Sequence, residues 1–169
     1  VYKRQTVGSA VRERLQRPLG GALKRGDDVC LVSHSMGCIV SYDVLWKFSR
    51  MSEYKHVREK SLSRWITLGN PLGEPGVQDN LYDANEREDG KYPTNVEHWV
   101  NIAAHDDFVS HDEDMANDFK EMRERGYVRS IKDHMIYNMW AGTSGSNPHK
   151  LYGYLDNPKV AREIARWIG

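Results

Sequence analysis

The sequence has no excess charge of either sign, because its 24 lysines and arginines are matched by 24 aspartates and glutamates. No strong electrostatic field therefore draws the chain to nucleic acid or to an anionic membrane surface, and we expect neither as a partner. No apolar run approaches the ~20 residues that a transmembrane helix needs, and the mean hydropathy is −0.72. These absences predict a soluble globular protein without a transmembrane segment.

Cysteine is also scarce, since the chain contains only Cys30 and Cys38. Cys30 falls in a predicted strand and Cys38 in the helix that follows it, an arrangement that does not suit a disulfide between them. Two unpaired thiols favour a reducing compartment, so we expect a cytoplasmic protein. The sequence also begins without a methionine or a secretory signal, and we expect the natural protein to start earlier.

Short apolar runs alternate with helical patterns along the whole chain. The runs predict strands at residues 29–32, 64–68, 96–104 and 129–137. The helical patterns predict helices at residues 7–24, 36–50, 112–125 and 158–168. Because strand and helix alternate, we expect one α/β domain over residues 1–169, with a parallel sheet of about four strands and flanking helices.

The sequence also predicts details of individual helices, strands and loops. Pro18 is expected to kink or end the first helix, and the strand at 29–32 is expected to be covered on both faces. Residues 141–148 are predicted to be a loop. In the last helix, Asn157 is the predicted cap, and Val160, Ile164 and Ile168 are expected to face inward.

The segment VCLVSHSMGCIV at residues 29–40 is the most informative part of the sequence. Its pattern predicts a buried strand, a sharp turn with Ser35 at its apex, and then a helix. Ser33 and Gly37, two positions to either side, are small, as a backbone that folds back on itself requires. Such a turn would push the serine hydroxyl out at the edge of the sheet, where the following helix aims its backbone N–H groups.

The motif Ser33-His34-Ser35-Met36-Gly37 resembles the nucleophile motif of the α/β-hydrolase family, which has the form small-x-Ser-x-Gly. It departs from that form in having Ser33 where glycine is commoner, which leaves Ser33 as an alternative nucleophile. The resemblance implies that Ser35 is the nucleophile and that the backbone N–H of Met36 is one oxyanion donor. It also implies that His34 is a neighbour of the nucleophile rather than its base, and that no metal or other cofactor is needed.

A serine hydroxyl also needs a base and a carboxylate that orients the base. The resemblance implies an acid in an Asp-x-Val turn just beyond a later strand, which is Asp107 here, with Asp106 as the alternative. It implies a base in the loop before the last helix, which is His149, with His134 as the alternative. The chain order Ser35, Asp107, His149, each after a strand, is the order that this fold requires.

The resemblance extends from about residue 7 to the end and corresponds to the C-terminal part of the α/β-hydrolase fold. The early strands of that fold, and the loop that supplies a second oxyanion donor, have no counterpart in the sequence, so the strand at 28–33 is expected to have an unpaired edge. The implied activity is esterase- or lipase-like hydrolysis of a carboxylic ester of a small molecule through an acyl-enzyme. We expect the polar excursion at residues 73–95 to cover the site and to favour soluble or short-chain acyl substrates.

Three other functions stay open. The same acyl-enzyme could pass its acyl group to an alcohol or an amine, and a hydrolase fold can also serve as a non-catalytic binding module. A metal site is the third, since metal-ligating residue types gather at His98, His105, Asp106, Asp107, His111 and Asp112. Their spacing fits no metal-binding motif. The sequence does not indicate an oligomeric state.

Overall fold

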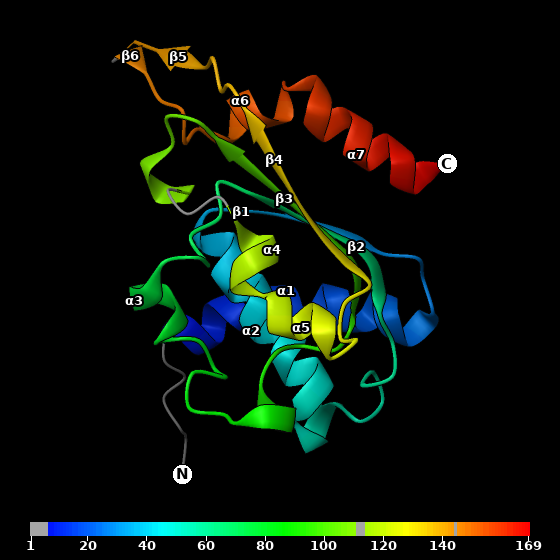
Figure 1. Cartoon of the computed structure of the whole chain (residues 1–169). Helices are drawn as coiled ribbons and strands as arrows, with labels where there is room; N and C mark the ends of the chain where they lie inside the picture. The colour runs from blue at the N-terminus through cyan, green and yellow to red at the C-terminus, as the bar shows by residue number, and fades with distance from the viewer. Residues whose placement is uncertain (1–6, 111–113, 144) are drawn as a thin grey trace.

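A computed structural model describes residues 7–110, 114–143 and 145–169 (Figure 1). Its centre is a four-stranded sheet of order β1-β2-β3-β4, in which every neighbouring pair is parallel. The strands are β1 (Cys30–His34), β2 (Leu62–Leu68), β3 (Val96–Ala104) and β4 (Ser130–Ile136). The predicted α/β class, with a parallel sheet of four strands and flanking helices, is confirmed.

Helices cover both faces of this sheet (Figure 1). One face carries α1 (Val7–Arg25), α2 (Met36–Arg50), α4 (Met115–Asp118) and α5 (Lys120–Glu124). The opposite face carries α6 (Leu151–Leu155) and α7 (Pro158–Ile168). Short helices α3 (Pro75–Gln78), η1 (Ser52–Tyr54), η2 (Glu88–Gly90) and η3 (Phe108–Ser110) lie in the connections. Within the described residues, no helix combines the length and apolar composition that crossing a bilayer requires.

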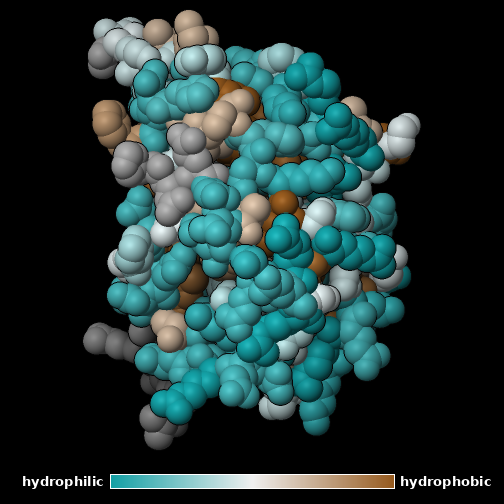
Figure 2. All heavy atoms as spheres, in the orientation of Figure 1, coloured by the Kyte–Doolittle hydropathy of each residue, from teal (hydrophilic) through white to brown (hydrophobic). Residues whose placement is uncertain are grey.

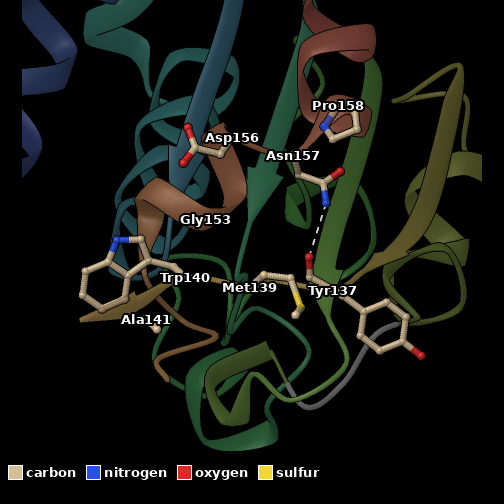
Figure 3. A pocket seen from close by; sticks show the side chains of 8 residues that line it. All are labelled: Tyr137, Met139, Trp140, Ala141, Gly153, Asp156, Asn157 and Pro158. Carbon is tan, nitrogen blue, oxygen red and sulfur yellow. Dashed lines mark hydrogen bonds between the residues drawn. The ribbon is translucent and has the colours of Figure 1, made fainter. Parts of the chain in front are cut away.

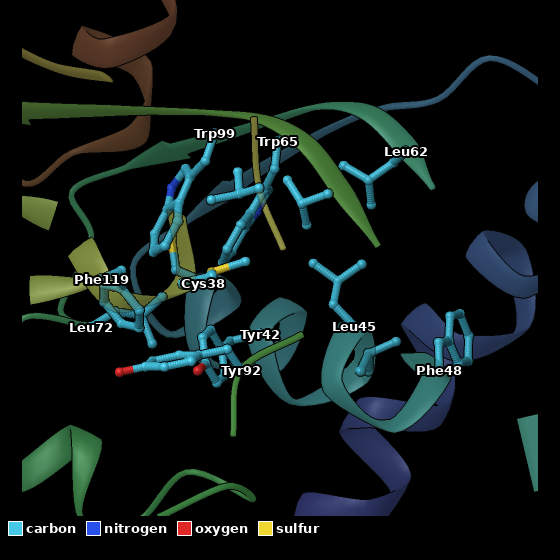
Figure 4. Close-up of a cluster of buried hydrophobic side chains, with 14 of the residues drawn as sticks. Cys38, Tyr42, Leu45, Phe48, Leu62, Trp65, Leu72, Tyr92, Trp99 and Phe119 are labelled. Atoms are coloured by element: carbon cyan, nitrogen blue, oxygen red, sulfur yellow. The ribbon is translucent and has the colours of Figure 1, made fainter. Parts of the chain in front are cut away.

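The core is divided by the sheet into two clusters, because successive side chains of a strand point to opposite faces. On the α2 face, the indoles of Trp65 and Trp99 stack with their ring centroids 4.5 Å apart (Figure 4). On the α7 face, Ile66, Leu68 and Val160 belong to a smaller apolar cluster. The two tryptophans come from adjacent strands in register and are both fully buried.

Ser33 is a structural residue of this core. Its oxygen accepts a hydrogen bond of 2.9 Å from the indole Nε1 of Trp65, and its hydroxyl lies 3.5 Å from the Cys38 sulfur, to which it donates. A buried indole N–H without an acceptor would be destabilising. A serine in place of the commoner glycine therefore satisfies Trp65, and Ser33 is not positioned as a nucleophile.

Two of the predicted helices differ from the structure. Helix α1 runs through Pro18 to Arg25, so it does not end at the proline. Leu23 beyond the proline is buried in the core, and this packing offsets the hydrogen bond that proline removes. The predicted helix at 112–125 is instead α4 and α5, separated at Phe119, where φ is −104°. The Phe119 ring packs on Trp99, with the ring centroids 4.9 Å apart, and this contact keeps Phe119 in the core.

The chain beyond β4 is more structured than predicted. The predicted loop at 141–148 contains a small antiparallel pair, β5 (Ala141–Gly142) and β6 (Gly145–Ser146). Helix α7 begins as predicted, because the Asn157 side chain accepts a hydrogen bond from the Lys159 N–H and Val160 is buried. The prediction that Ile168 faces inward is wrong, since this last helical residue is 72% exposed.

Strand β1 lies at one edge of the sheet in the described part of the chain. The expected unpaired edge is therefore present. The prediction that this strand is covered on both faces is wrong, because Val32, which points to the α7 face, is 38% exposed. Helix α7 contacts β2, where Arg64 pairs with Glu163, and leaves Val32 of β1 partly open.

The excursion at residues 73–95 packs against α2 rather than over the end of the sheet. The hydroxyl of Tyr42 and the backbone N–H of Tyr92 both donate to Asp83, at 2.6 and 2.9 Å, and the indole of Trp46 donates to the Gly90 carbonyl at 2.9 Å. These bonds turn the polar residues of the excursion toward the helix. The expectation that this segment covers the predicted site is not supported by its contacts.

Replacing Ser33 with alanine tests its structural role. The substitution leaves the buried Trp65 N–H without its acceptor, so we expect a loss of ~1–3 kcal/mol in the free energy of unfolding, measured by urea denaturation. The matched control Ser61→Ala changes an exposed serine and should shift stability by no more than about 0.5 kcal/mol. Equal stability of the two variants would contradict this role.

Candidate active site

Ser35 occupies a strained turn between β1 and α2. Its backbone has φ 56° and ψ −130°, a region that residues other than glycine rarely adopt. Its N–H donates to the Leu68 carbonyl at 3.0 Å, which ties the turn to the next strand. A Cβ atom at Gly37 would lie 4.0 Å from that of Ser33, an ordinary van der Waals contact. The turn presents the Ser35 hydroxyl at the carboxyl edge of the sheet.

The structure brings the three predicted site residues together. His149 Nε2 lies 2.8 Å from the Ser35 Oγ, and His149 Nδ1 lies 2.9 Å from both carboxylate oxygens of Asp107. Ser35 follows β1, Asp107 follows β3, and His149 comes from the segment between β6 and α6. With a proton on Nδ1, His149 donates to Asp107 and accepts from the Ser35 hydroxyl, which is the arrangement that activates a serine.

Asp107 is held as a carboxylate in a buried position. Tyr154 donates its hydroxyl to Oδ2 at 2.6 Å, and the backbone N–H of Val109 donates to Oδ1 at 2.9 Å. Burial acts to raise the pKa of the Asp107 carboxyl, but the hydrogen bonds from Tyr154, His149 and Val109 outweigh it, so that this pKa lies below its usual value. The carboxylate is thus charged where it faces the imidazole.

Two side chains hold the segment that carries His149. The Nε2–H of His34 donates to the backbone carbonyl of His149 at 2.8 Å, and burial lowers the pKa of His34, which favours its neutral form. The buried Asn138 amide donates to the carbonyls of Pro148 and Lys150, at 2.6 and 2.9 Å. The backbone is therefore fixed on both sides of His149. Sequence analysis missed Asn138, because a single asparagine after a strand carries no pattern.

Gly69 lies directly behind the Asp107–His149 pair. It has φ 53°, and a Cβ atom there would come 2.9 Å from Asp107 Oδ2 and 3.1 Å from His149 Nδ1. The end of β2 must therefore be a glycine, for its backbone conformation and for space. The sequence contains one signal for it, the turn residues Gly69-Asn70-Pro71 after a predicted strand, which marks a turn but not a site.

The alternative site residues are placed elsewhere. Asp106 is exposed, whereas Asp107 is buried against His149. His134 lies across the sheet from the serine turn, with its Nε2 3.6 Å from Glu163 of α7, and burial lowers its pKa. Neither residue is therefore positioned to replace Asp107 or His149.

The possible metal ligands do not converge in the described residues. No group of three or more histidines, cysteines, aspartates or glutamates there could hold a metal ion. His98 contacts the Ser130 hydroxyl at 2.9 Å, and the ring of His105 packs on Tyr137. The remaining candidates, His111 and Asp112, lie outside the described residues.

Several hollows lie near this edge of the sheet. A recess beside the catalytic candidates is lined by His34, Asn147, His149, Lys150, Leu151 and Tyr152. A separate pocket lies between the end of β4 and the start of α7, where the Asn157 amide donates to the Tyr137 carbonyl at 3.3 Å (Figure 3). Only the first contains a member of the Ser35–His149–Asp107 group, so it is the candidate substrate site.

Met36, the predicted oxyanion donor, is the first residue of α2. The first backbone N–H groups of a helix have no intrahelical acceptor, and they favour negative charge. The Met36 N–H follows the nucleophile candidate directly, as the predicted role requires. The geometry therefore offers a nucleophile, a base, an orienting acid and one candidate donor for a developing oxyanion.

No family model, curated protein or solved structure matches this chain. The functional argument therefore depends on the geometry of the site.

Replacing Gly69 with alanine should disrupt the Asp107–His149 pair. We expect the reaction of Ser35 with a fluorophosphonate to slow about 100-fold, because a displacement of ~1 Å at a catalytic group has an effect of that size. Gly126→Ala is the matched control: Gly126 has φ 74° but open space around the position of its Cβ. The Gly126→Ala variant shares the backbone strain, so it should be less stable than the wild type, but its Ser35 should react with the fluorophosphonate at the wild-type rate. Equal reactivity of the two variants would contradict the packing argument.

Replacing Tyr154 with phenylalanine tests the electrostatics of Asp107. The variant loses a donor to the carboxylate and the acceptor of the Ala104 N–H, so we expect a loss of ~1–3 kcal/mol in unfolding free energy at neutral pH. The pKa of Asp107 is lowered in the folded state, so the stabilisation is present above the ordinary aspartate pKa and is lost as pH falls through the folded value. The difference between the two proteins should narrow on acidification. A constant difference would show that Tyr154 acts only through packing and Ala104.

Proposed function

We propose that this protein is a serine hydrolase of the α/β-hydrolase kind that cleaves a carboxylic ester through an acyl-enzyme. The observation that carries the proposal is the hydrogen-bonded series Ser35–His149–Asp107, whose members come from three separate segments at one edge of a parallel sheet. The strained backbone of Ser35 adds support, since strain of this kind clusters at functional sites.

The proposed reaction has two stages. Ser35 Oγ attacks the ester carbonyl while His149 Nε2 takes its proton, and the Met36 N–H stabilises the oxyanion. His149 then protonates the leaving alcohol, and water hydrolyses the acyl-enzyme with His149 again as the base. Asp107 holds the imidazole in the Nδ1-protonated form and stabilises the positive charge that forms on it. The reaction as proposed uses no cofactor.

The surroundings of the site support a small ester with an apolar portion. Met36, Phe108 and Tyr152, which follow the three members of the triad along the chain, all have exposed side chains. Apolar side chains are exposed at the upper end of the molecule in Figure 2, around α6 and the β5–β6 pair. We therefore infer the substrate from these exposed apolar side chains. The polar excursion at 73–95 is not used for this, because it packs against α2.

The cysteines support a reducing, cytoplasmic location as part of the proposal. Cys30 and Cys38 are both free thiols. Burial raises the pKa of the Cys38 thiol to about 12, so this group stays protonated and unreactive in the core. Neither thiol is assigned a catalytic role.

The proposal predicts which residues a fluorophosphonate probe needs. Ser35→Ala should abolish covalent labelling, and His149→Ala should reduce its rate almost as far, because the members of a triad act as a unit. The matched controls Ser33→Ala and His134→Ala should keep most of the labelling. Intact-protein mass spectrometry measures the adduct, and peptide mapping locates it.

The same experiment separates the competing functions. Labelling that persists in Ser35→Ala would overturn Ser35 as the nucleophile, and labelling that fails in the wild type would favour a binding module. Where Ser35 is labelled, release of acid rather than a new ester in the presence of an added alcohol supports hydrolysis over acyl transfer.

A further inference from the structure

The recess beside His149 contains a lysine but no acidic side chain. Its lining residues are His34, Asn147, His149, Lys150, Leu151 and Tyr152. The charged group among them is the ammonium of Lys150, which directly follows the proposed base. Because none of these residues carries a carboxylate, the recess presents positive charge to whatever enters it.

The position of the Lys150 ammonium is set by two aromatic rings. Its Nζ lies 5.4 Å from the centroid of the Trp140 ring and 6.0 Å from that of Tyr152. Contacts of this kind attract a cation without neutralising it. Across residues 7–110, 114–143 and 145–169, no carboxylate lies within ion-pair distance of this nitrogen. A lysine that rests on two rings and has no ion-pair partner among the described residues loses less entropy when it binds an anion.

The nearby Asp107 does not supply the missing negative charge. Its side chain is fully buried behind the His149 imidazole and accepts hydrogen bonds from His149, Tyr154 and Val109. The negative charge of Asp107 is therefore compensated by these hydrogen bonds and does not act on Lys150. The Lys150 ammonium lies over Trp140 and Tyr152 instead, and Lys150 lines the same recess as His149.

We propose that Lys150 determines specificity by binding an anionic group, a carboxylate or a phosphate, on the alcohol portion of the ester substrate. This inference rests on the proposed function, in which His149 protonates the leaving oxygen. The alcohol therefore departs beside His149, and His149 and Lys150 line the same recess. An anion on that alcohol would lie against the ammonium, whereas an anion on the acyl side would stay attached to Ser35.

The test compares two esters of nearly equal shape, 4-carboxyphenyl butyrate and 4-carbamoylphenyl butyrate, in steady-state kinetics. In Lys150→Met, the KM for the charged ester should rise about tenfold, as loss of a single partly shielded charge contact implies. The KM for the neutral ester should change less than about twofold, and kcat should change little for either. Lys150→Arg should keep most of the preference. Lys55→Met, which removes an exposed lysine of the η1 connection, is the matched control and should change neither value.

Each outcome bears on the inference. An equal change for both esters in Lys150→Met, or no change, would overturn it. A larger change for mono-4-nitrophenyl glutarate, whose anion is on the acyl side, would overturn the assignment to the alcohol.

Fluorophosphonate labelling of Ser35 separates this inference from the proposed function. If labelling depends on Ser35 and His149 but the ester preference does not depend on Lys150, the role of Lys150 alone is wrong. If Ser35 is not labelled at all, both proposals fail together. Competition is a further check. In the wild type, 4-hydroxybenzoate should slow labelling more than 4-hydroxybenzamide does. In Lys150→Met, the two compounds should slow labelling equally.

Discussion

The hydrogen bonds between the Asp107 carboxylate and His149 Nδ1 are the interaction on which the rest of the site depends. They fix the imidazole so that its other nitrogen lies 2.8 Å from the Ser35 hydroxyl. A parallel sheet makes this contact possible, because the carboxyl ends of its strands share one edge and the segments that follow them start side by side. The sheet therefore brings together residues that are far apart in the sequence.

The neighbouring residues mainly restrict the conformations of Asp107 and His149. Tyr154 and the Val109 N–H hold the carboxylate, and Asn138 holds the backbone on both sides of the histidine. Gly69 leaves the space that both groups occupy. In contrast, His149 also lines a recess that contains Lys150, which has no ion-pair partner among the described residues. Rigid support behind the pair and an accessible surface in front of it are what a reacting group requires.

The sequence was sufficient for the sheet and for the three residues of the proposed triad. Apolar runs and a serine between small neighbours are local patterns, and the resemblance to the α/β-hydrolase motif then implied the acid and the base. Asn138 could not be found in this way, because its role depends on a backbone segment ten residues later. The break at Phe119 was missed for a related reason: tertiary packing overrides local propensity. The sequence also did not indicate where the excursion at 73–95 packs.

The central claim is that His149 carries its proton on Nδ1, toward Asp107, and leaves Nε2 free to accept from Ser35. Long-range ¹H–¹⁵N correlation NMR of the imidazoles measures this tautomer directly in the folded protein near neutral pH. The account predicts the Nδ1-protonated form for His149, with a downfield proton signal that disappears in Asp107→Ala. An Nε2-protonated His149 whose signals are unchanged by that substitution would contradict it.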